Sequence, residues 1–312
     1  MSEAVSGPLA GREPLLTERT TGAVAKTDVT VRPRRRWPRH YPPLLATVLM
    51  AIFLVTAVFG PMLSPYSADT TDFAAAMKPP AWQAAGTLAH PLGTDQLGRD
   101  LLTRIMHGAR LSLILSLIGV AGAGTIGIGL GLIAGYTRGW VSDIIMRVVD
   151  AFLALPFFLV ALAFVAALGV SITNIIVVMA LTTWPPFTRL VRSEALRVRE
   201  ADYVALARIS GVPGWRIALV HVLPNVMNGV IVLATLDVGR IILLESGLSF
   251  LGLGVQPPTV SWGLLLSDGK QFMIFAWWLT VLPGLALLLT VLAFNTLGDW
   301  LRDRFDPRLE SN

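Results

Sequence analysis

The sequence predicts an all-α integral membrane protein with six transmembrane helices, and three observations lead to this fold class. First, 54% of the 312 residues are hydrophobic and only 14% are charged, with a mean hydropathy of +0.65, whereas ordinary soluble domains carry about 25% charged residues. Second, the apolar residues form uncharged runs that reach the roughly 20 residues a helix needs to cross a bilayer. Third, arginines concentrate in alternate connecting segments, as they do on the cytoplasmic side of membrane proteins.

The apolar runs follow one another along the chain. The first opens with Pro42 and Pro43, which the first turn of a helix tolerates. A single uncharged run at 151–187 is long enough for two spans, which we expect to join at a tight turn at 169–174. The transmembrane domain as a whole occupies residues 41–312. Its spans are expected at about 41–63, 111–136, 150–168, 172–188, 225–244 and 273–298.

Residues 1–40 differ in kind from the rest, because they are rich in Ser, Thr, Glu, Pro and Arg. They lack the apolar core of a signal peptide, so we interpret them as a disordered cytoplasmic tail that ends in a basic anchor. Binding of anionic lipid is an alternative role for such a cluster. With this tail inside, the arginines favour a cytoplasmic location for both termini, N-in and C-in. The cytoplasmic basic residues outside the segment 189–224 are then Arg32, Arg34, Arg35, Arg36, Arg39, Arg138, Arg147, Arg302, Arg304 and Arg308.

Composition argues against several classes of function. The chain has no cysteine, which excludes disulfides, thiolate metal sites and cysteine nucleophiles. Its net charge of +5 comes from basic residues where a membrane protein needs cytoplasmic anchors, so we expect no nucleic-acid partner. His90, His107 and His221 are too scattered to predict a metal site. No nucleophile–base pair stands out, and we expect neither a catalytic site nor a cofactor in this chain.

Small residues mark one face of the second expected span. Gly127, Gly131 and Gly135 recur every four residues, with Ala123 one step earlier. Such a face lets helix backbones approach closely in lipid. The stripe predicts tight packing against a neighbouring helix, either in this chain or in a second subunit.

Ionisable residues inside a span are costly and indicate function by default. Asp237 and Arg240 are three residues apart in the fifth expected span, on one helical face, and Glu245 lies just beyond it. Two interpretations stay open. These residues line a substrate path, or they form an internal ion pair that stabilises the helix bundle.

A polar segment at 189–224 separates two apolar spans and points most directly to function. Residues 205–207 favour a helix, and Gly211, followed by Pro213 and Gly214, ends it. We expect Gly211 to adopt a left-handed conformation, which other residues reach only at a cost. A short surface helix with compact side chains fits a groove on a soluble partner. An amphipathic helix resting on lipid is the alternative.

Further motifs accompany this segment, at 90–100 with 108–113, at 248–258 with 261–263, and at 298–307. Together with it they resemble the C-type permease of dipeptide, oligopeptide and nickel ABC importers, over residues 40–308. In the first motif, Asp95 and Asp100 stand in the sequences Gly-Thr-Asp and Gly-Arg-Asp. Such residues suggest a cation or phosphate site, but turn formation and helix capping are the favoured roles.

The polar segment resembles the coupling loop of that family, which reads Glu-Ala-Ala, three residues, Gly, nine residues, a hydrophobic position, any residue and Leu-Pro. Ala205, Leu206 and Ala207 occupy the Glu-Ala-Ala positions, Gly211 the glycine, and 223–224 the final Leu-Pro. Ala205 and Leu206 replace the usual glutamate and alanine, and the missing glutamate puts a salt bridge from this position to the ATPase in doubt. The residues expected to couple to the ATPase are Glu200, Asp202, Tyr203, Ala205, Leu206, Ala207, Gly211 and Pro224.

The resemblance implies a type I ABC importer permease fold, in a subunit that forms half of a translocation path for peptides or related small solutes. The implied partners, beside the bilayer, are a homologous B-type permease, two cytoplasmic ABC ATPases or one fused ATPase, and an extracytoplasmic substrate-binding protein. ATP and Mg would be bound by the ATPases, so this chain itself is not an enzyme. The implied location is the cytoplasmic membrane of a bacterium or archaeon. The rival is an ion-gradient-driven secondary transporter that uses Asp237 and Glu245, but the inverted repeats that would support it are not visible.

Overall fold

The computed structural model describes residues 41–137 and 139–305. Every regular element in this part of the chain is a helix, in agreement with the expected fold class. The expected tail at 1–40, Arg138 and residues 306–312 lie outside the described residues. The helices are α1 (Leu44–Leu63), η1 (Phe73–Ala75), α2 (Leu101–Tyr136), α3 (Trp140–Ala154), α4 (Phe157–Leu168), α5 (Ile172–Arg199), α6 (Asp202–Ile209), α7 (Gly214–Ile217), η2 (Ala218–Val222), α8 (Leu223–Phe250), α9 (Trp262–Gly269), η3 (Lys270–Phe272) and α10 (Trp278–Phe305).

Four helical stretches in the described residues are long and apolar enough to cross a membrane, namely α1, α2, Gly214–Phe250 and α10. Helices α3 and α4 meet this requirement only as a pair, which is bent by 97° at the break between them. Helix α5 does not meet it, because threonines, prolines and an asparagine dilute its first half and charged residues fill its second. The candidate spans number four, or five with the bent pair, so the expected number of six is not confirmed.

Several helices are longer than the apolar runs that predict them. Helix α2 begins at Leu101 rather than at residue 111, because the Asp100 side chain caps it by accepting a hydrogen bond from the backbone N–H of Thr103 at 2.8 Å. Helix α8 continues to Phe250 and α10 to Phe305, whereas we expected ends at 244 and 298. Capping residues and tertiary contacts set the ends of a helix, while an apolar run marks only the part that suits lipid.

The motif at 90–100 forms turns in the loop before α2. It also connects this loop to α9, a helix that the sequence did not predict. The Asp95 carboxylate accepts hydrogen bonds from the backbone N–H groups of Leu97 and Arg99, both at 2.9 Å. The predicted role of this motif in turns and capping is therefore confirmed. Arg104 is buried between Asp95 at 3.6 Å and Asp268 of α9 at 3.7 Å. Burial raises the pKa of Asp268, and the positive charge of Arg104 opposes this change.

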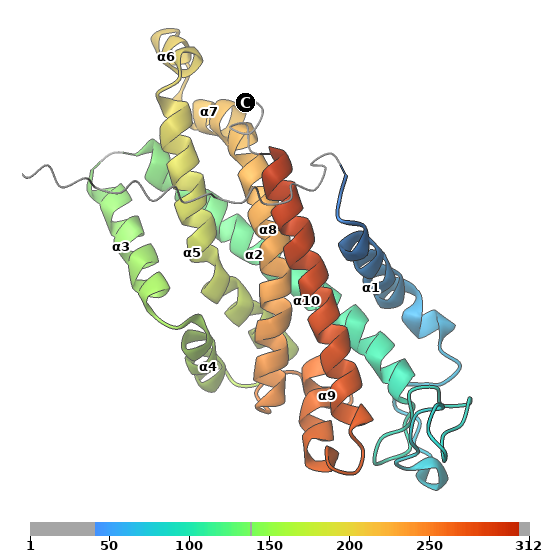
Figure 1. Cartoon of the computed structure of the whole chain (residues 1–312). Helices are drawn as coiled ribbons and strands as arrows, with labels where there is room; N and C mark the ends of the chain where they lie inside the picture. The colour runs from blue at the N-terminus through green and yellow to red at the C-terminus, as the bar shows by residue number, and fades with distance from the viewer. Residues whose placement is uncertain (1–40, 138, 306–312) are drawn as a thin grey trace, which may run out of the picture. The chain divides into compact units, whose positions relative to one another are not determined.

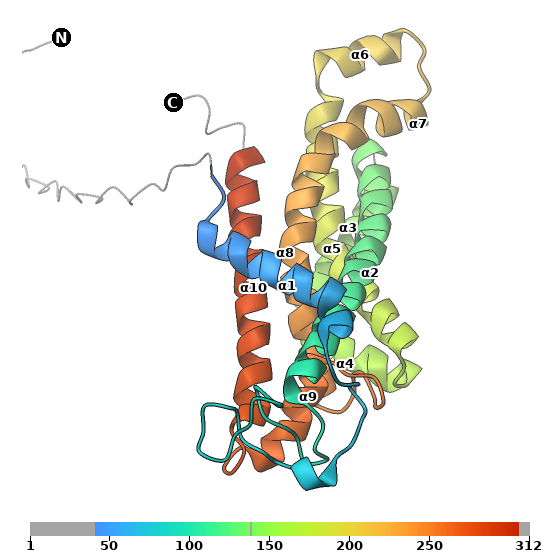
Figure 2. The same cartoon turned by 90° about the vertical axis from the view of Figure 1, so that its right-hand side faces the viewer.

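Figures 1 and 2 show that the helices run between two ends of the domain. One end, which we call the α6 end, carries α6, α7 and the last residues of α10. The other, the α9 end, carries α4, α9 and the loop at 64–100. Helices α1, α3 and α8 run toward the α9 end, and α2, α5 and α10 run back toward the α6 end.

The glycine stripe of α2 packs against α5. A Cβ atom added at Gly131 would lie 2.6 Å from the Cβ of Val191, and one added at Gly135 would lie 2.6 Å from the Cβ of Ala195. Gly127 faces α5 in the same way. These distances leave no room for a side chain, so the two backbones approach closely. The prediction of tight packing against a neighbouring helix is confirmed, and that neighbour belongs to this chain.

Candidate coupling site and translocation path

The polar segment contains the short helix that the sequence predicts within it, α6. Gly211, just beyond its end, has a φ of +77°, so the expected left-handed conformation is confirmed. The Gly211 N–H donates to the carbonyl of Arg208 at 3.0 Å, and the N–H of Val212 donates to the carbonyl of Ala207 at 3.1 Å. This pair of bonds is the Schellman arrangement that closes a helix C-terminus.

Contacts on one side of α6 hold it to the start of α8. Val204 is completely buried. The Tyr203 ring meets the His221 ring edge to face with 6.2 Å between centroids, and the side-chain amide of Asn225 donates to the Tyr203 hydroxyl at 3.4 Å. Just before α6, the Arg199 guanidinium donates to the carbonyl of Gly135 at 3.1 Å, which ties the segment to the end of α2. Helix α6 is therefore held directly to η2 and α8, and the end of α5 that precedes it is held to α2.

The opposite side of α6 is apolar and exposed. Leu206 is 63% exposed and Ile209 is 84% exposed, and Tyr203, which also contacts α8, is 46% exposed at the edge of this side. Because the three residues are spaced by three, they lie along one helical face, which we call the α6 face. Figure 2 shows α6 projecting at its end of the domain, beyond the longer helices. Exposed apolar side chains on a fixed helix form a surface that another protein can cover.

The other residues predicted for coupling lie around this helix. Asp202 begins α6, where a negative charge suits the helix dipole, and Ala205 is exposed beside the α6 face. Glu200 ends α5 and lies 3.6 Å from Arg199. Pro224 stands in the first turn of α8, away from α6 in the chain. No group of three or more His, Asp or Glu side chains within 41–137 and 139–305 is placed to hold a metal ion.

After α6, residues 210–213 form a short non-helical connection, and continuous helix begins at α7. From α7 the chain passes through η2, a single π-helical turn, directly into α8. Together these three elements form the 37-residue stretch Gly214–Phe250. A force on α6 can therefore reach α8 through the four-residue connection 210–213 and then through continuous helix, and it can reach α5 through two residues of connection. The sequence did not predict the π-helical turn, although such turns occur frequently at functional sites.

The structure brings Asp237 and Arg240 together. One Asp237 carboxylate oxygen lies 3.9 Å from the Arg240 guanidinium, and Asp237 is only 4% exposed. The guanidinium also lies 4.4 Å from the centre of the Phe157 ring, a cation–π contact to α4. The second carboxylate oxygen of Asp237 is buried and has no hydrogen-bond partner among the described residues. The predicted pairing on one helical face is confirmed, with one buried oxygen left unsatisfied.

Glu245 lies apart from that pair, at the α9 end of α8. It is 1% exposed and accepts a hydrogen bond from the Ser249 hydroxyl at 2.6 Å. The Ser249 oxygen in turn accepts from the backbone N–H of Val255 at 3.0 Å. Glu245 thus holds the chain that follows α8 against that helix, an arrangement that stabilises the local structure.

A cavity of about 640 Å³ lies between α3, α5, α8 and α10 near the α6 end, and we call it the polar cavity. Its walls are partly aliphatic, but five polar side chains from three helices also border it. These residues are Arg189, Ser193, Glu194, Asn228 and Arg302. Sequence reasoning missed this site, because it treated the two arginines only as cytoplasmic anchors. Ser193 in the polar segment and Asn228 at the start of the fifth expected span offered a weak signal.

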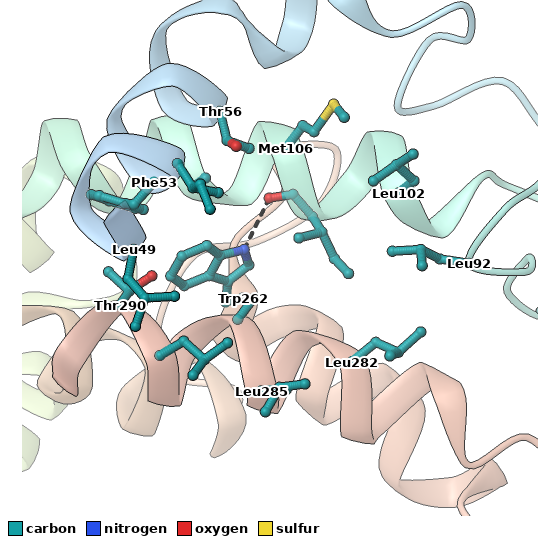
Figure 3. Close-up of a pocket in the computed structure, with 15 residues that line it drawn as sticks. Leu49, Phe53, Thr56, Leu92, Leu102, Met106, Trp262, Leu282, Leu285 and Thr290 are labelled. Carbon is teal, nitrogen blue, oxygen red and sulfur yellow. Dashed lines mark hydrogen bonds between the residues drawn. The ribbon is translucent and has the colours of Figure 1, made fainter. Parts of the chain in front are cut away.

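A smaller cavity of about 330 Å³ lies between α1, α2 and α10 and is almost wholly apolar (Figure 3). Figure 3 shows Phe53 and Leu285 on its walls, and the indole of Trp262 donating to the carbonyl of Ile105 at 2.9 Å. No ionisable side chain lines this cavity. It therefore does not suit a charged solute, in contrast to the polar cavity.

Comparisons with known proteins agree with this architecture. Residues 127–311 match the family described as binding-protein-dependent transport system inner membrane component, and residues 34–80 match the N-terminal TM domain of oligopeptide transport permease C. The di/tripeptide transport system permease protein DppC of Pseudomonas aeruginosa is 43% identical over 85% of this chain and 87% of its own length. The dipeptide transport system permease protein DppC of Escherichia coli is 42% identical over 87% of this chain and 91% of its own length. The glutathione transport system permease protein GsiD of Pectobacterium atrosepticum is 38% identical over 89% of this chain and 90% of its own length.

The fold also resembles that of a solved transporter. An inward-facing structure of the MetNI methionine ABC transporter superposes with a TM-score of 0.52, over 63% of this chain and 93% of that chain. Sequence identity in this comparison is 16%, so the similarity concerns the fold. The family match, by contrast, spans more than half of the sequence, and the permease relatives cover most of it. The chain therefore belongs to the binding-protein-dependent transport system inner membrane components, and it is a DppC/OppC-like permease of an ABC importer.

Proposed function

We propose that this permease carries dipeptides, oligopeptides or closely related small solutes across the cytoplasmic membrane of a bacterium or archaeon. The names of the relatives support peptides, because they specify di- and tripeptides, dipeptides and glutathione, which is itself a tripeptide. The polar cavity supports the same class, because it combines aliphatic walls with charged and amide groups. Peptides present the same mixture of side chains and polar backbone.

We further propose six membrane spans, with both termini in the cytoplasm. The spans are α1, α2, the bent pair α3 and α4, α5, α8 and α10. The alternating directions of these helices support this count, and residues 172–188 of α5 are uncharged. In this topology the α6 end is cytoplasmic, which agrees with the arginines in the segment 189–224. The α9 end and the loop at 64–100 are extracytoplasmic.

The single observation that carries the mechanism is the exposed α6 face on a helix fixed to the bundle. We propose that Leu206 and Ile209, with Tyr203 beside them, enter a groove on a cytoplasmic ABC ATPase. Glu200, Asp202, Ala205 and Ala207 contribute to the same contact, with Gly211 and Pro224 shaping the segment that carries it. ATP and Mg are bound by the ATPases, and their closure moves α6 and, through it, α5 and α8. This chain breaks no bond itself.

The complete importer in this proposal contains a homologous B-type permease, two ATPase subunits or one fused ATPase, and an extracytoplasmic substrate-binding protein. The translocation path lies between the two permeases. Asp237 and Arg240 border the path near its middle, where a paired but partly unsatisfied carboxylate offers an acceptor to a passing solute. The enclosed position of Glu245 favours a structural role for that residue near the α9 end of the path.

Reconstitution into proteoliposomes tests this function. The complete complex, with its binding protein, should take up radiolabelled dialanine only when ATP is present on the cytoplasmic side. The chain alone should neither hydrolyse ATP nor accumulate dialanine under a proton gradient, because it contributes only a path and a contact surface. Accumulation by the chain alone, driven by a proton or sodium gradient, would instead identify a secondary transporter and contradict the proposal.

A further inference from the structure

The polar cavity borders the two helices that α6 is placed to move. Its walls come from α5 and α8, with Leu153 of α3 and the end of α10 completing it. Residues 186–194 of α5 and 228–236 of α8 lie near the α6 end of each helix. A movement of α6 would therefore change the shape of this cavity before it changed any region nearer the α9 end.

The charges around the polar cavity do not cancel. The Arg189 guanidinium pairs with the Asp150 carboxylate, and Glu194 pairs with Arg197 at 2.6 Å. Arg302 also lines the cavity, and it has no ion pair within the described ranges 41–137 and 139–305. Among the described residues, one positive charge at the cavity is therefore uncompensated, so the cavity has the electrostatics of a site for an anionic group.

Uncharged polar groups also line the polar cavity. The Ser193 hydroxyl donates to the carbonyl of Leu190 at 2.8 Å, which leaves its oxygen free to accept. The amide of Asn228 makes no hydrogen bond to protein in the described residues and is exposed, so it is free to donate and to accept. Leu233 and Phe305 supply apolar wall. The cavity thus offers partners for a carboxylate, for peptide amides and for a small apolar side chain.

We propose that the polar cavity is a subsite for the peptide in transit, in which Arg302 binds the terminal carboxylate. This inference rests on the proposed function and adds the position and chemistry of one site on the path. An arginine presents a planar pair of donors that matches a carboxylate. Because Arg302 is exposed to water, the attraction is screened and weak. A weak anion site near the cytoplasmic end guides the peptide out without retaining it.

The absence of native cysteine provides a direct test of the electrostatics. Ser193→Cys introduces a single thiol into the cavity of the assembled complex, and Asn228→Cys provides a second position if the first variant is poorly produced. The thiol is modified with anionic sulfonatoethyl and cationic trimethylammonium-ethyl methanethiosulfonates, and the ratio of the two rates reports the local potential. Arg302→Gln should lower the anionic-to-cationic ratio by about threefold or more. Arg216→Gln removes a charge from the same end but not from the cavity, so it should leave the ratio unchanged.

Protection by peptide tests the ligand itself, in the same complex. Dialanine should slow modification of the cavity thiol, the C-terminal amide of dialanine should slow it much less, and Arg302→Gln should remove the difference. Equal ratios with and without Arg302, or equal protection by the acid and the amide, would overturn the subsite. Protection that depends on the second permease and not on peptide would also overturn it, since the cavity would then be an interface between subunits.

Uptake measured on the same preparation separates the two proposals. If dialanine is taken up while the modification rates depend neither on peptide nor on Arg302, the proposed subsite is wrong and the proposed function as a peptide permease is retained. If the complex takes up no peptide at all, the proposed function itself is contradicted.

Discussion

Glycine serves two different purposes in two regions of this molecule. In α2, Gly131 is needed because no side chain fits, since an added Cβ would lie 2.6 Å from the Cβ of Val191. After α6, Gly211 has nothing within 4 Å of an added Cβ, but its φ of +77° is a conformation that suits glycine. The first glycine provides space and the second provides a backbone shape.

The difference separates the part of the chain that must stay packed from the part that we propose meets a partner. The contact between α2 and α5 is buried and built from close backbones, so changes there should affect folding. The α6 face is exposed and joined to the bundle by a few contacts around Val204 and Tyr203. Changes there should leave folding almost intact and affect only what α6 contacts.

The largest expected effect is at the packed glycine. Gly131→Leu would force a side chain against Val191 and against the backbone carbonyl of Thr188, which an added Cβ already approaches to 2.9 Å. Overpacking of this kind costs about 3 kcal/mol. We expect a strong loss of the chain from the membrane and a fall in Tm of the detergent-solubilised protein of roughly 5–10 °C. Gly129→Leu is the matched control, because nothing lies within 4 Å of its Cβ. Equal abundance and Tm of the two variants would refute the packing role of the stripe.

A smaller effect is expected at the ion pair inside the bundle. Asp237→Arg and Arg240→Asp should each impair assembly or uptake, and the double reversal should recover part of the loss, because the two groups lie 3.9 Å apart on one face. We expect a coupling energy of about 1 kcal/mol in the double-mutant cycle. The contact of Arg240 with Phe157 does not survive the reversal, so recovery should be incomplete. The exposed pair Glu194 and Arg197 provides a comparison and should couple more weakly. Strict additivity at 237 and 240 would mean that the two side chains act independently.

The sequence predicted the features that depend on local chemistry. The short helix α6, the conformation of Gly211, the stripe that meets α5 and the pairing of Asp237 with Arg240 all follow from spacing and residue type. The apolar pattern placed the start of α2 at residue 111 instead of Leu101, because a capping aspartate and the buried Arg104 extend that helix beyond its apolar part. The same pattern placed one span at 150–168, although the chain bends by 97° at the break between α3 and α4, which contains Pro156.

The polar cavity could not be predicted, because four helices that are distant in the sequence form it. Arg189 and Arg302 read as membrane anchors when each is considered on its own helix. Glu245 was grouped with Asp237 because the sequence separates them by only two turns. In the fold, the serine at 249 and the chain after α8 enclose Glu245 instead.

The central claim is that α6 is the element through which an ATPase drives this permease. Gly211→Asp tests it most directly, measured as ATP-dependent dialanine uptake and as the amount of ATPase that copurifies. Replacing this glycine costs about 1 kcal/mol of local backbone energy and adds a negative charge beside the α6 face, while the packed helices are untouched. Gly211→Asn is the matched control for shape, because Asn tolerates the left-handed conformation without adding charge. Ala205→Glu is a control for an added charge at an exposed position, which the coupling-loop pattern that this segment resembles assigns to glutamate.

The account predicts that Gly211→Asp leaves near-normal amounts of the chain in the membrane but abolishes uptake, with ATPase lost from the complex or hydrolysing ATP without transport. Gly211→Asn and Ala205→Glu should keep most of the uptake. Normal uptake and normal ATPase association in Gly211→Asp would contradict the claim, and α6 would then be a helix that rests on lipid.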